Sequence, residues 1–132
     1  MPRFMLFMYP AISTEEYEGG PALDDVEAMT RYNEELTKAG ALLAADGLQP
    51  EASRVSSSGV TDGPFSEAKE LVGGYWIIQA KDREEAVEWA KRCPMGAGPF
   101  IEVRQIWEMT DFPEDIQNAA QLSAEPPHQT SA

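Results

Sequence analysis

The stretch Gly-Gly-Tyr-Trp-Ile-Ile-Gln-Ala, residues 73–80, decides the fold of this chain. Its aromatic and β-branched side chains predict a strand over 75–80, entered through two glycines that permit close backbone approach. Apolar side chains occupy both sets of alternating positions, so both faces of this strand need cover. Residues 3–9, Arg-Phe-Met-Leu-Phe-Met-Tyr, show the same pattern and predict a second strand of this kind.

A helix is predicted directly after the strand at 75–80. Asp82, followed three residues later by Glu85, is typical of a capping box at a helix start. Pro94 ends this helix, because proline cannot continue it. Three small side chains recur at helical spacing and share one face: Ala86, Ala90 and Cys93.

An earlier helix is predicted from Asp24 or Asp25, either of which can cap it, to about Lys38. Gly40 suits the left-handed position that follows a helix. This helix carries one stripe that can face a core, formed by Val26, Met29, Asn33 and Leu36.

Three further strands are predicted. Residues 41–48 form one that ends or bulges at Asp46-Gly47. The polar run 53–58 is a weak strand suited to a sheet edge. Residues 101–109 alternate in character and form the last strand.

The predicted elements follow the order β-α-β-(β)-β-α-β, the split βαβ pattern of ferredoxin-like α+β domains. In this fold both helices pack on one face of an antiparallel sheet, and the other face is left bare. Since the strands at 3–9 and 75–80 are apolar there as well, we expect a homodimer formed through the sheet face. The domain is expected over 1–111, and the small, polar, proline-rich segment 112–132 is expected to be a flexible tail.

Composition narrows the possible partners. The 132 residues fit one domain, and a hydrophobic fraction of 42% is enough for a packed core. The chain has 10 Lys and Arg against 23 Asp and Glu, a net charge of −13, which disfavours nucleic acid and anionic membranes as partners. The single cysteine allows no intrachain disulfide, and no apolar run approaches the roughly 18 residues that span a bilayer. We therefore expect a cytoplasmic protein.

The sequence does not support a catalytic role for histidine or cysteine, two side chains that often act in catalysis. The only histidine, His128, lies in the proline-rich tail, and Cys93 is interpreted as a small buried hydrophobe. The glycines at 73–74 and 96–98 match neither a phosphate-binding loop nor a dinucleotide-binding turn, so we expect no cofactor.

The densest polar constellation is residues 61–70, which lead into Tyr75. Two interpretations stay open: a tight structural turn with solvated charges, or a ligand-facing cluster whose carboxylates act as a base if partly buried. Arg104 is likewise either a solvated cation or a buried one that holds a carboxylate ligand. The acids of this run and Asp46 have oxygens that suit Mg²⁺ or Ca²⁺, but their spacing matches no dedicated loop, and we expect no metal site. The candidate ligand-binding residues are Asp62, Gly63, Pro64, Phe65, Glu67, Lys69, Glu70, Tyr75 and Arg104.

A family resemblance rests on these residues. The run Asp62-Gly63-Pro64-Phe65-Ser66-Glu67-Ala68-Lys69-Glu70-Leu71-Val72-Gly73-Gly74-Tyr75 resembles the signature of the DGPF proteins within the YCII-related (YciI-like) family. Three more segments agree with it, so that it covers about residues 1–110: Phe4-Met5-Leu6, Gly40-Ala41-Leu42 to Gly47-Leu48, and Ile101-Glu102-Val103-Arg104. The resemblance implies a ferredoxin-like domain that dimerises through its sheet, similar to the muconolactone-isomerase-like dimeric α/β barrels.

The resemblance also bears on activity. Many YciI-like proteins carry a histidine paired with an acid in a cleft near the dimer interface, and the matching helical position in this chain is about Met29. DGPF proteins occur beside or fused to extracytoplasmic-function sigma factors, which implies a regulatory or ligand-sensing role with a sigma-factor partner.

Three functions follow as hypotheses. The first is a homodimeric domain that binds a small molecule in a cleft near the dimer interface, in a regulatory role. The second is a small cofactor-independent enzyme, of isomerase, lyase or monooxygenase-like type, that uses Asp62, Glu67 or Glu70 as a base. The third is a structural protein–protein interaction module.

Overall fold

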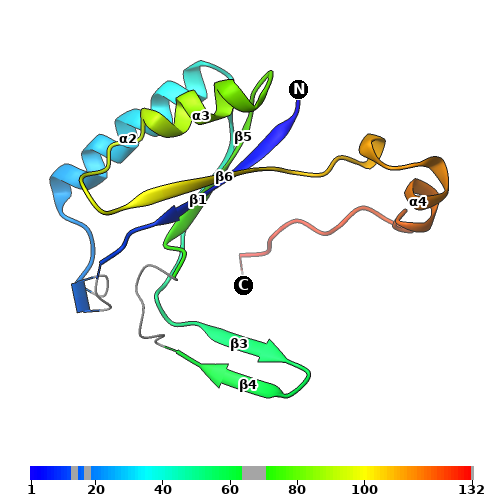
Figure 1. Ribbon diagram of the computed structural model, residues 1–132, viewed down its shortest axis with the longest axis horizontal. Helices are drawn as coiled ribbons and strands as arrows, with labels where there is room; N and C mark the ends of the chain where they lie inside the picture. Colours follow the sequence, from blue (N-terminus) through cyan, green and yellow to red (C-terminus); the bar gives the residue numbers. More distant parts are fainter. Residues whose placement is uncertain (13–14, 17–18, 64–70, 132) are drawn as a thin grey trace.

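The computed structural model describes residues 1–12, 15–16, 19–63 and 71–131 (Figure 1). Within these residues the predicted elements are present except for the edge strand at 53–58, where a hairpin forms, and two short helices follow the last strand. In chain order they are β1 (Arg3–Tyr9), α2 (Leu23–Lys38), β2 (Leu42–Gly47), β3 (Ser53–Ser56), β4 (Gly59–Asp62), β5 (Gly74–Gln79), α3 (Arg83–Lys91), β6 (Phe100–Gln105), the 3₁₀ helix η2 (Met109–Asp111) and α4 (Glu114–Ala119).

Four strands form one antiparallel sheet in the order β2-β5-β1-β6. This order is compatible with the ferredoxin-like split βαβ pattern, and the predicted α+β class is confirmed. β1 and β5, the two strands that are apolar on both faces, lie at the centre of the sheet. β1 begins at Arg3 and ends at Tyr9, as the sequence predicts.

Helices α2 and α3 lie side by side on one face of the sheet (Figure 1). The side chains that alternate toward them are fully buried, with Phe4, Leu6 and Ile78 at 0% exposure. Met5, Phe7 and Ile77 occupy the intervening positions and are only partly covered. We call the face that carries these three residues the open face. Arg104 lies directly opposite Met5 on the neighbouring strand β6, and therefore on the same face.

Helix α2 starts differently from the prediction. Its N-cap is Ala22, which makes no side-chain capping bond, so the prediction that Asp24 or Asp25 caps the helix is wrong. Both carboxylates lie inside the first turn, where their negative charges interact favourably with the positive end of the helix dipole. The C-terminal prediction is confirmed: Gly40 has a φ of 72°, and the Ala41 N–H donates to the Leu36 carbonyl at 2.9 Å in a Schellman pattern.

Helix α3 begins as predicted, because the Asp82 side chain accepts a hydrogen bond from the Glu85 N–H at 2.9 Å. The predicted apolar face of α3 is buried, and it includes Cys93 just beyond the helix. The Tyr32 hydroxyl of α2 donates to the Trp89 carbonyl at 2.6 Å, which fixes the two helices to each other.

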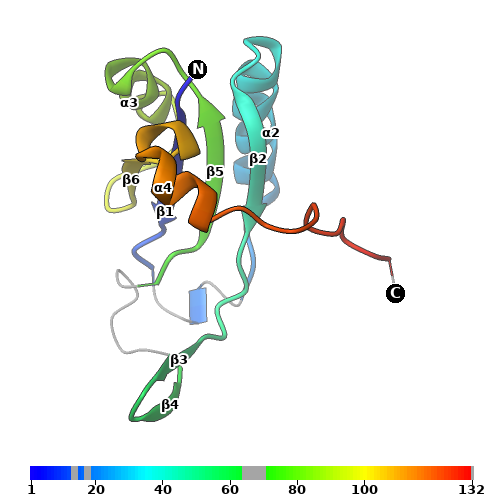
Figure 2. The same cartoon turned by 90° about the vertical axis from the view of Figure 1, so that its right-hand side faces the viewer.

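The polar run 53–58 does not form a single edge strand. Ser53–Ser56 turns back through residues 57–58 and pairs with Gly59–Asp62 as a separate two-stranded sheet. Gly59 adopts a φ of 138° at this turn, a conformation that L side chains rarely adopt. The β3–β4 hairpin lies away from the main sheet in both views (Figures 1 and 2), and its paired Val55 and Val60 are 75% and 63% exposed.

Strand β6 is shorter than predicted and ends at Gln105 instead of 109. Its partner β1 has no residues left to pair, since the Ile106 N–H already donates to the carbonyl of Arg3, the first residue of β1. Beyond this point the chain runs away from the sheet to η2 and α4 (Figure 1), and Glu108 accepts a hydrogen bond from Arg3 at 2.7 Å. This bond lowers the pKa of Glu108.

The described residues contain no helix with the length and apolar character needed to cross a membrane.

Candidate functional site

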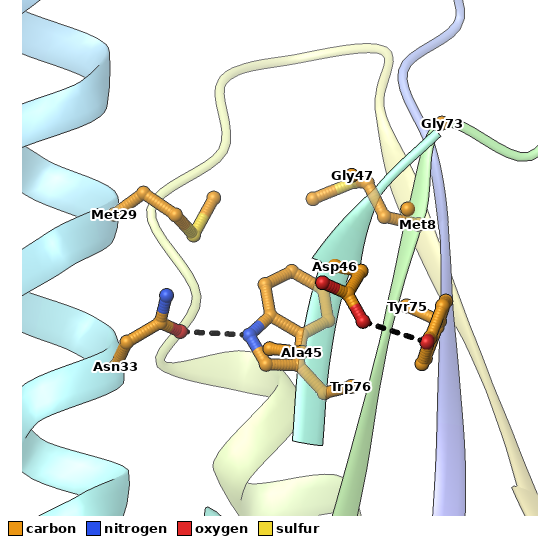
Figure 3. Close-up of a pocket in the computed structure, with 10 residues that line it drawn as sticks. Met8, Met29, Asn33, Ala45, Asp46, Gly47, Gly73, Tyr75 and Trp76 are labelled. Atoms are coloured by element: carbon orange, nitrogen blue, oxygen red, sulfur yellow. Dashed lines mark hydrogen bonds between the residues drawn. The ribbon is translucent and has the colours of Figure 1, made fainter. Parts of the chain in front are cut away.

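A cavity of about 240 Å³ lies between helix α2 and the ends of strands β2 and β5 (Figure 3). Four elements that are distant in sequence contribute to it, because the sheet brings β1, β2 and β5 together beneath α2. Its lining is mainly apolar and consists of Met8, Met29, Asn33, Ala45, Asp46, Gly47, Gly73, Gly74, Tyr75 and Trp76.

Trp76 forms the rigid wall of the cavity. It is only 5% exposed, and its indole N–H donates to the Asn33 side-chain oxygen at 2.8 Å. Tyr32 packs edge-on against the indole, with ring centroids 5.8 Å apart and an interplanar angle of 88°. These contacts fix the indole ring, so the cavity offers a preformed aromatic surface.

Two methionines line the cavity from opposite sides. Met29 projects from α2 and Met8 from the end of β1, and their thioether groups point toward one another (Figure 3). Methionine is unbranched and polarisable, so this part of the lining can adapt to a bound molecule more readily than the Trp76 wall.

Asp46 and Tyr75 border the cavity, but their side chains lie on the open face, because Tyr75 pairs with Phe7 and Asp46 pairs with Tyr75. These residues face each other across β2 and β5, and the Tyr75 hydroxyl donates to Asp46 Oδ2 at 2.8 Å. This hydrogen bond, together with slight burial and the neighbouring negative charge, raises the pKa of Tyr75. Tyr75 is therefore a hydrogen-bonding group at neutral pH, with its proton held toward the carboxylate.

Gly74 explains how closely the two strands approach at this point. A Cβ atom on Gly74 would lie 3.0 Å from the Asp46 carbonyl oxygen and 3.4 Å from Gly47 Cα. The expected close backbone approach at the glycine pair is thus confirmed at Gly74.

The predicted ligand-binding residues lie in different places. Tyr75 borders the cavity with its side chain on the open face, Arg104 is exposed on the open face, and Asp62 ends the β3–β4 hairpin, where it accepts a hydrogen bond from Ser53 Oγ at 2.6 Å. The Gly63 N–H donates to the Ala52 carbonyl at 2.7 Å at the base of the hairpin. The other candidates lie outside the described residues: Pro64, Phe65, Glu67, Lys69 and Glu70.

Sequence reasoning did not identify most of the cavity. Met29 and Asn33 are part of the predicted helix stripe, and Asp46 enters only as a carboxylate of the kind that metals bind. From the strand patterns, Met8 and Trp76 are interpreted only as core residues. These residues form a site only in three dimensions, because they come from β1, α2, β2 and β5.

The chemistry of the lining favours neutral ligands. Among the described residues no Lys or Arg lines the cavity, and the Asp46 carboxylate lies on the open face beside Tyr75. The described residues also contain no group of three or more His, Cys, Asp or Glu side chains arranged to hold a metal ion.

The fold and the cavity define a small α+β domain with a hollow between one helix and the end of its sheet. A family model for the YCII-related domain matches residues 3–110, and the chain belongs to that family. This confirms the resemblance stated for the sequence. A search of curated proteins found no match.

Proposed function

We propose that this YCII-related protein binds a small, mainly apolar organic molecule in the cavity beside Trp76. The observation that supports this proposal is the fixed indole wall, held by Asn33 and Tyr32, next to two adaptable methionines. Such a combination of a rigid aromatic surface with few polar groups is typical of small-molecule sites. The net charge of −13 disfavours an anionic ligand.

Binding is favoured over histidine-based catalysis. The only histidine of the chain, His128, lies in the C-terminal segment, and the helix position that the resemblance assigns to the family histidine is occupied by Met29, which lines the cavity. A thioether cannot carry a proton in acid–base catalysis. The enzyme alternative needs a carboxylate at the cavity, but Asp62 lies on the β3–β4 hairpin and the Asp46 carboxylate lies on the open face with Tyr75.

We also propose that a second copy of the chain covers the open face. Met5, Phe7 and Ile77 form an apolar centre on this face, which no helix of the described residues covers. Removing such a surface from water stabilises association by roughly 25 cal/mol per Å². A dimer measured by light scattering at micromolar concentration is expected, and a monodisperse monomer would refute this part of the proposal. A sigma-factor partner stays a prediction of the resemblance.

Native mass spectrometry of gently purified protein tests both parts of the proposal. A dimer that retains a small-molecule mass is the expected result. The cavity is then tested by titrating a retained compound into the parent and into Ala45→Leu, which fills the cavity from β2. Binding is expected to weaken at least tenfold in Ala45→Leu and to stay unchanged in Ala119→Leu, a matched control on the exposed helix α4. Equal affinity for both variants would remove the cavity from the proposal.

A further inference from the structure

The cavity beside Trp76 has one side-chain amide in its lining, that of Asn33. Among the described lining residues, the carboxylate and the phenol belong to Asp46 and Tyr75, which turn to the open face and bind each other. Asn33 projects from α2 toward the indole on the helix-covered side of the sheet (Figure 3). Its amide is therefore the polar group that a molecule in the cavity meets.

The hydrogen bond to Trp76 fixes which end of this amide is available. An indole N–H can only donate, so the atom of Asn33 that lies 2.8 Å from it is the side-chain oxygen. The amino group, Nδ2, is then at the other end of the amide, and Figure 3 shows it on the Met29 side of the bond. Nδ2 has no acceptor among the described residues.

This donor is held in place before any molecule binds. The Asn33 oxygen is tied to the indole, and the indole is 5% exposed and packed edge-on against Tyr32. A donor that loses water without gaining an acceptor costs free energy, so a bound molecule is favoured when it brings an acceptor to this position. A fixed donor also sets the orientation of that molecule in an otherwise apolar cavity.

We propose that the cavity beside Trp76 binds a neutral carbonyl compound, whose oxygen accepts a hydrogen bond from Asn33 Nδ2. The inference rests on the proposed function and names the ligand class of that site. The hydrocarbon part of the ligand packs on the indole and on the two methionines, Met8 and Met29. A carbonyl oxygen accepts and does not donate, so one donor is enough to satisfy it.

Other oxygen-containing groups fit this lining less well. A carboxylate also accepts, but the described lining residues include no Lys or Arg, and the net charge of −13 adds a repulsive field. A hydroxyl group has to place its own proton as well, and the side-chain oxygen of Asn33 already accepts from the indole. A carbonyl makes neither demand.

The test exchanges the donor for an acceptor and keeps the bond to Trp76. Asn33→Asp leaves an oxygen opposite the indole N–H and replaces the amino group by a second oxygen. Asn118→Asp, the same substitution at an exposed position of α4, is the matched control. Binding is followed by NMR at the indole N–H of Trp76, the single tryptophan in a Trp89→Phe/Trp107→Phe background.

Three probes of similar shape separate the donor from the apolar contacts: cyclohexanone, methylenecyclohexane and protonated cyclohexylamine. Asn33→Asp is expected to weaken cyclohexanone binding by roughly fivefold or more, because the carbonyl oxygen loses its donor and faces a carboxylate. Methylenecyclohexane has a CH₂ group in place of the oxygen, and its binding is expected to change by less than about twofold. Cyclohexylamine is expected to bind Asn33→Asp more tightly than the parent, a gain that a purely structural role of Asn33 does not produce.

The parent protein supplies a second readout that needs no substitution at Asn33. The side-chain amide protons of Asn33 are expected to shift with cyclohexanone and to stay nearly unchanged with methylenecyclohexane. Equal shifts with both probes, or an Asn33→Asp variant that weakens both alike, would overturn the carbonyl as the ligand class. If Ala45→Leu still blocks both probes, the proposed site stands without it. Cyclohexanone that binds Ala45→Leu as tightly as the parent would instead refute the proposed site.

Discussion

The two faces of strands β1 and β5 both carry apolar side chains, but their surroundings differ. On β1, Phe4 and Leu6 are completely buried beneath the helices, whereas Met5 and Phe7 are partly exposed on the open face. β5 repeats the contrast with Ile78 and Ile77. An apolar side chain therefore does not show by itself what covers it, because helices cover one face and the residues on the other face are only partly covered.

The largest difference between the faces is expected in stability. Ile78→Ala creates a cavity in the helix-covered core and is expected to reduce the free energy of unfolding by about 2–5 kcal/mol. Ile77→Ala, the neighbouring residue on the open face, is the matched control and is expected to cost less than about 1 kcal/mol in protein diluted to monomer. Urea denaturation measures both, and equal losses would show that the two faces are equally buried within one chain.

A charge on the open face is expected to change assembly more than folding. Ile77→Asp places a carboxylate at the centre of the proposed dimer interface, so light scattering is expected to give the mass of a monomer with an unchanged circular dichroism spectrum. Val55→Asp, at an exposed position of the β3–β4 hairpin, is expected to remain dimeric. A dimeric Ile77→Asp protein would place the interface elsewhere.

The cap of α3 tests how the covered face is held. Asp82→Ala removes the bond to the Glu85 N–H and is expected to cost about 0.5–2 kcal/mol in thermal or urea denaturation. Asp82→Asn retains an acceptor and is expected to recover most of this loss. Glu84→Ala, at an exposed position of the same first turn, serves as the control. An unchanged Asp82→Ala protein would mean that the cap does not stabilise the helix.

The smallest effect is expected at Cys93, under the same helix. Burial raises the pKa of the Cys93 thiol to about 11, above its ordinary range. As the pH rises, the thiol ionises in the unfolded chain before it does so in the folded one. The stability gained from burying the neutral thiol is therefore fully present below about pH 9 and is lost between about pH 9 and 11. The difference in unfolding free energy between the parent and Cys93→Ala is expected to shrink by about 1 kcal/mol from pH 8 to pH 10. A constant difference would show that the thiol is solvated.

The sequence predicts the elements whose signals are local. The bounds of β1, the Asp82 cap and the left-handed Gly40 each depend on a few neighbouring residues. The end of β6 is different, because it depends on where its antiparallel partner β1 starts. The hairpin was missed because its polar strands face solvent on both sides and carry no apolar alternation.

The cavity, like the end of β6, depends on contacts between residues that are far apart in the chain. Tyr75 was identified from the motif that precedes it, but Met8, Asn33 and Trp76 meet only after β1, α2 and β5 have assembled. A helix stripe or a strand alternation predicts that a side chain is covered. It does not predict which covered positions leave a hollow, since this depends on the packing of residues far apart in the chain.

The exposed turn of the β3–β4 hairpin is a suitable site for attaching a covalent label. Ser57 and Ser58 connect two strands that pair with each other and not with the main sheet, and the single native thiol, Cys93, is buried. A Ser57→Cys substitution would thus provide one reactive thiol for a spin label or fluorophore. In a dimer, the distance measured between two such labels would give the separation of the two hairpins.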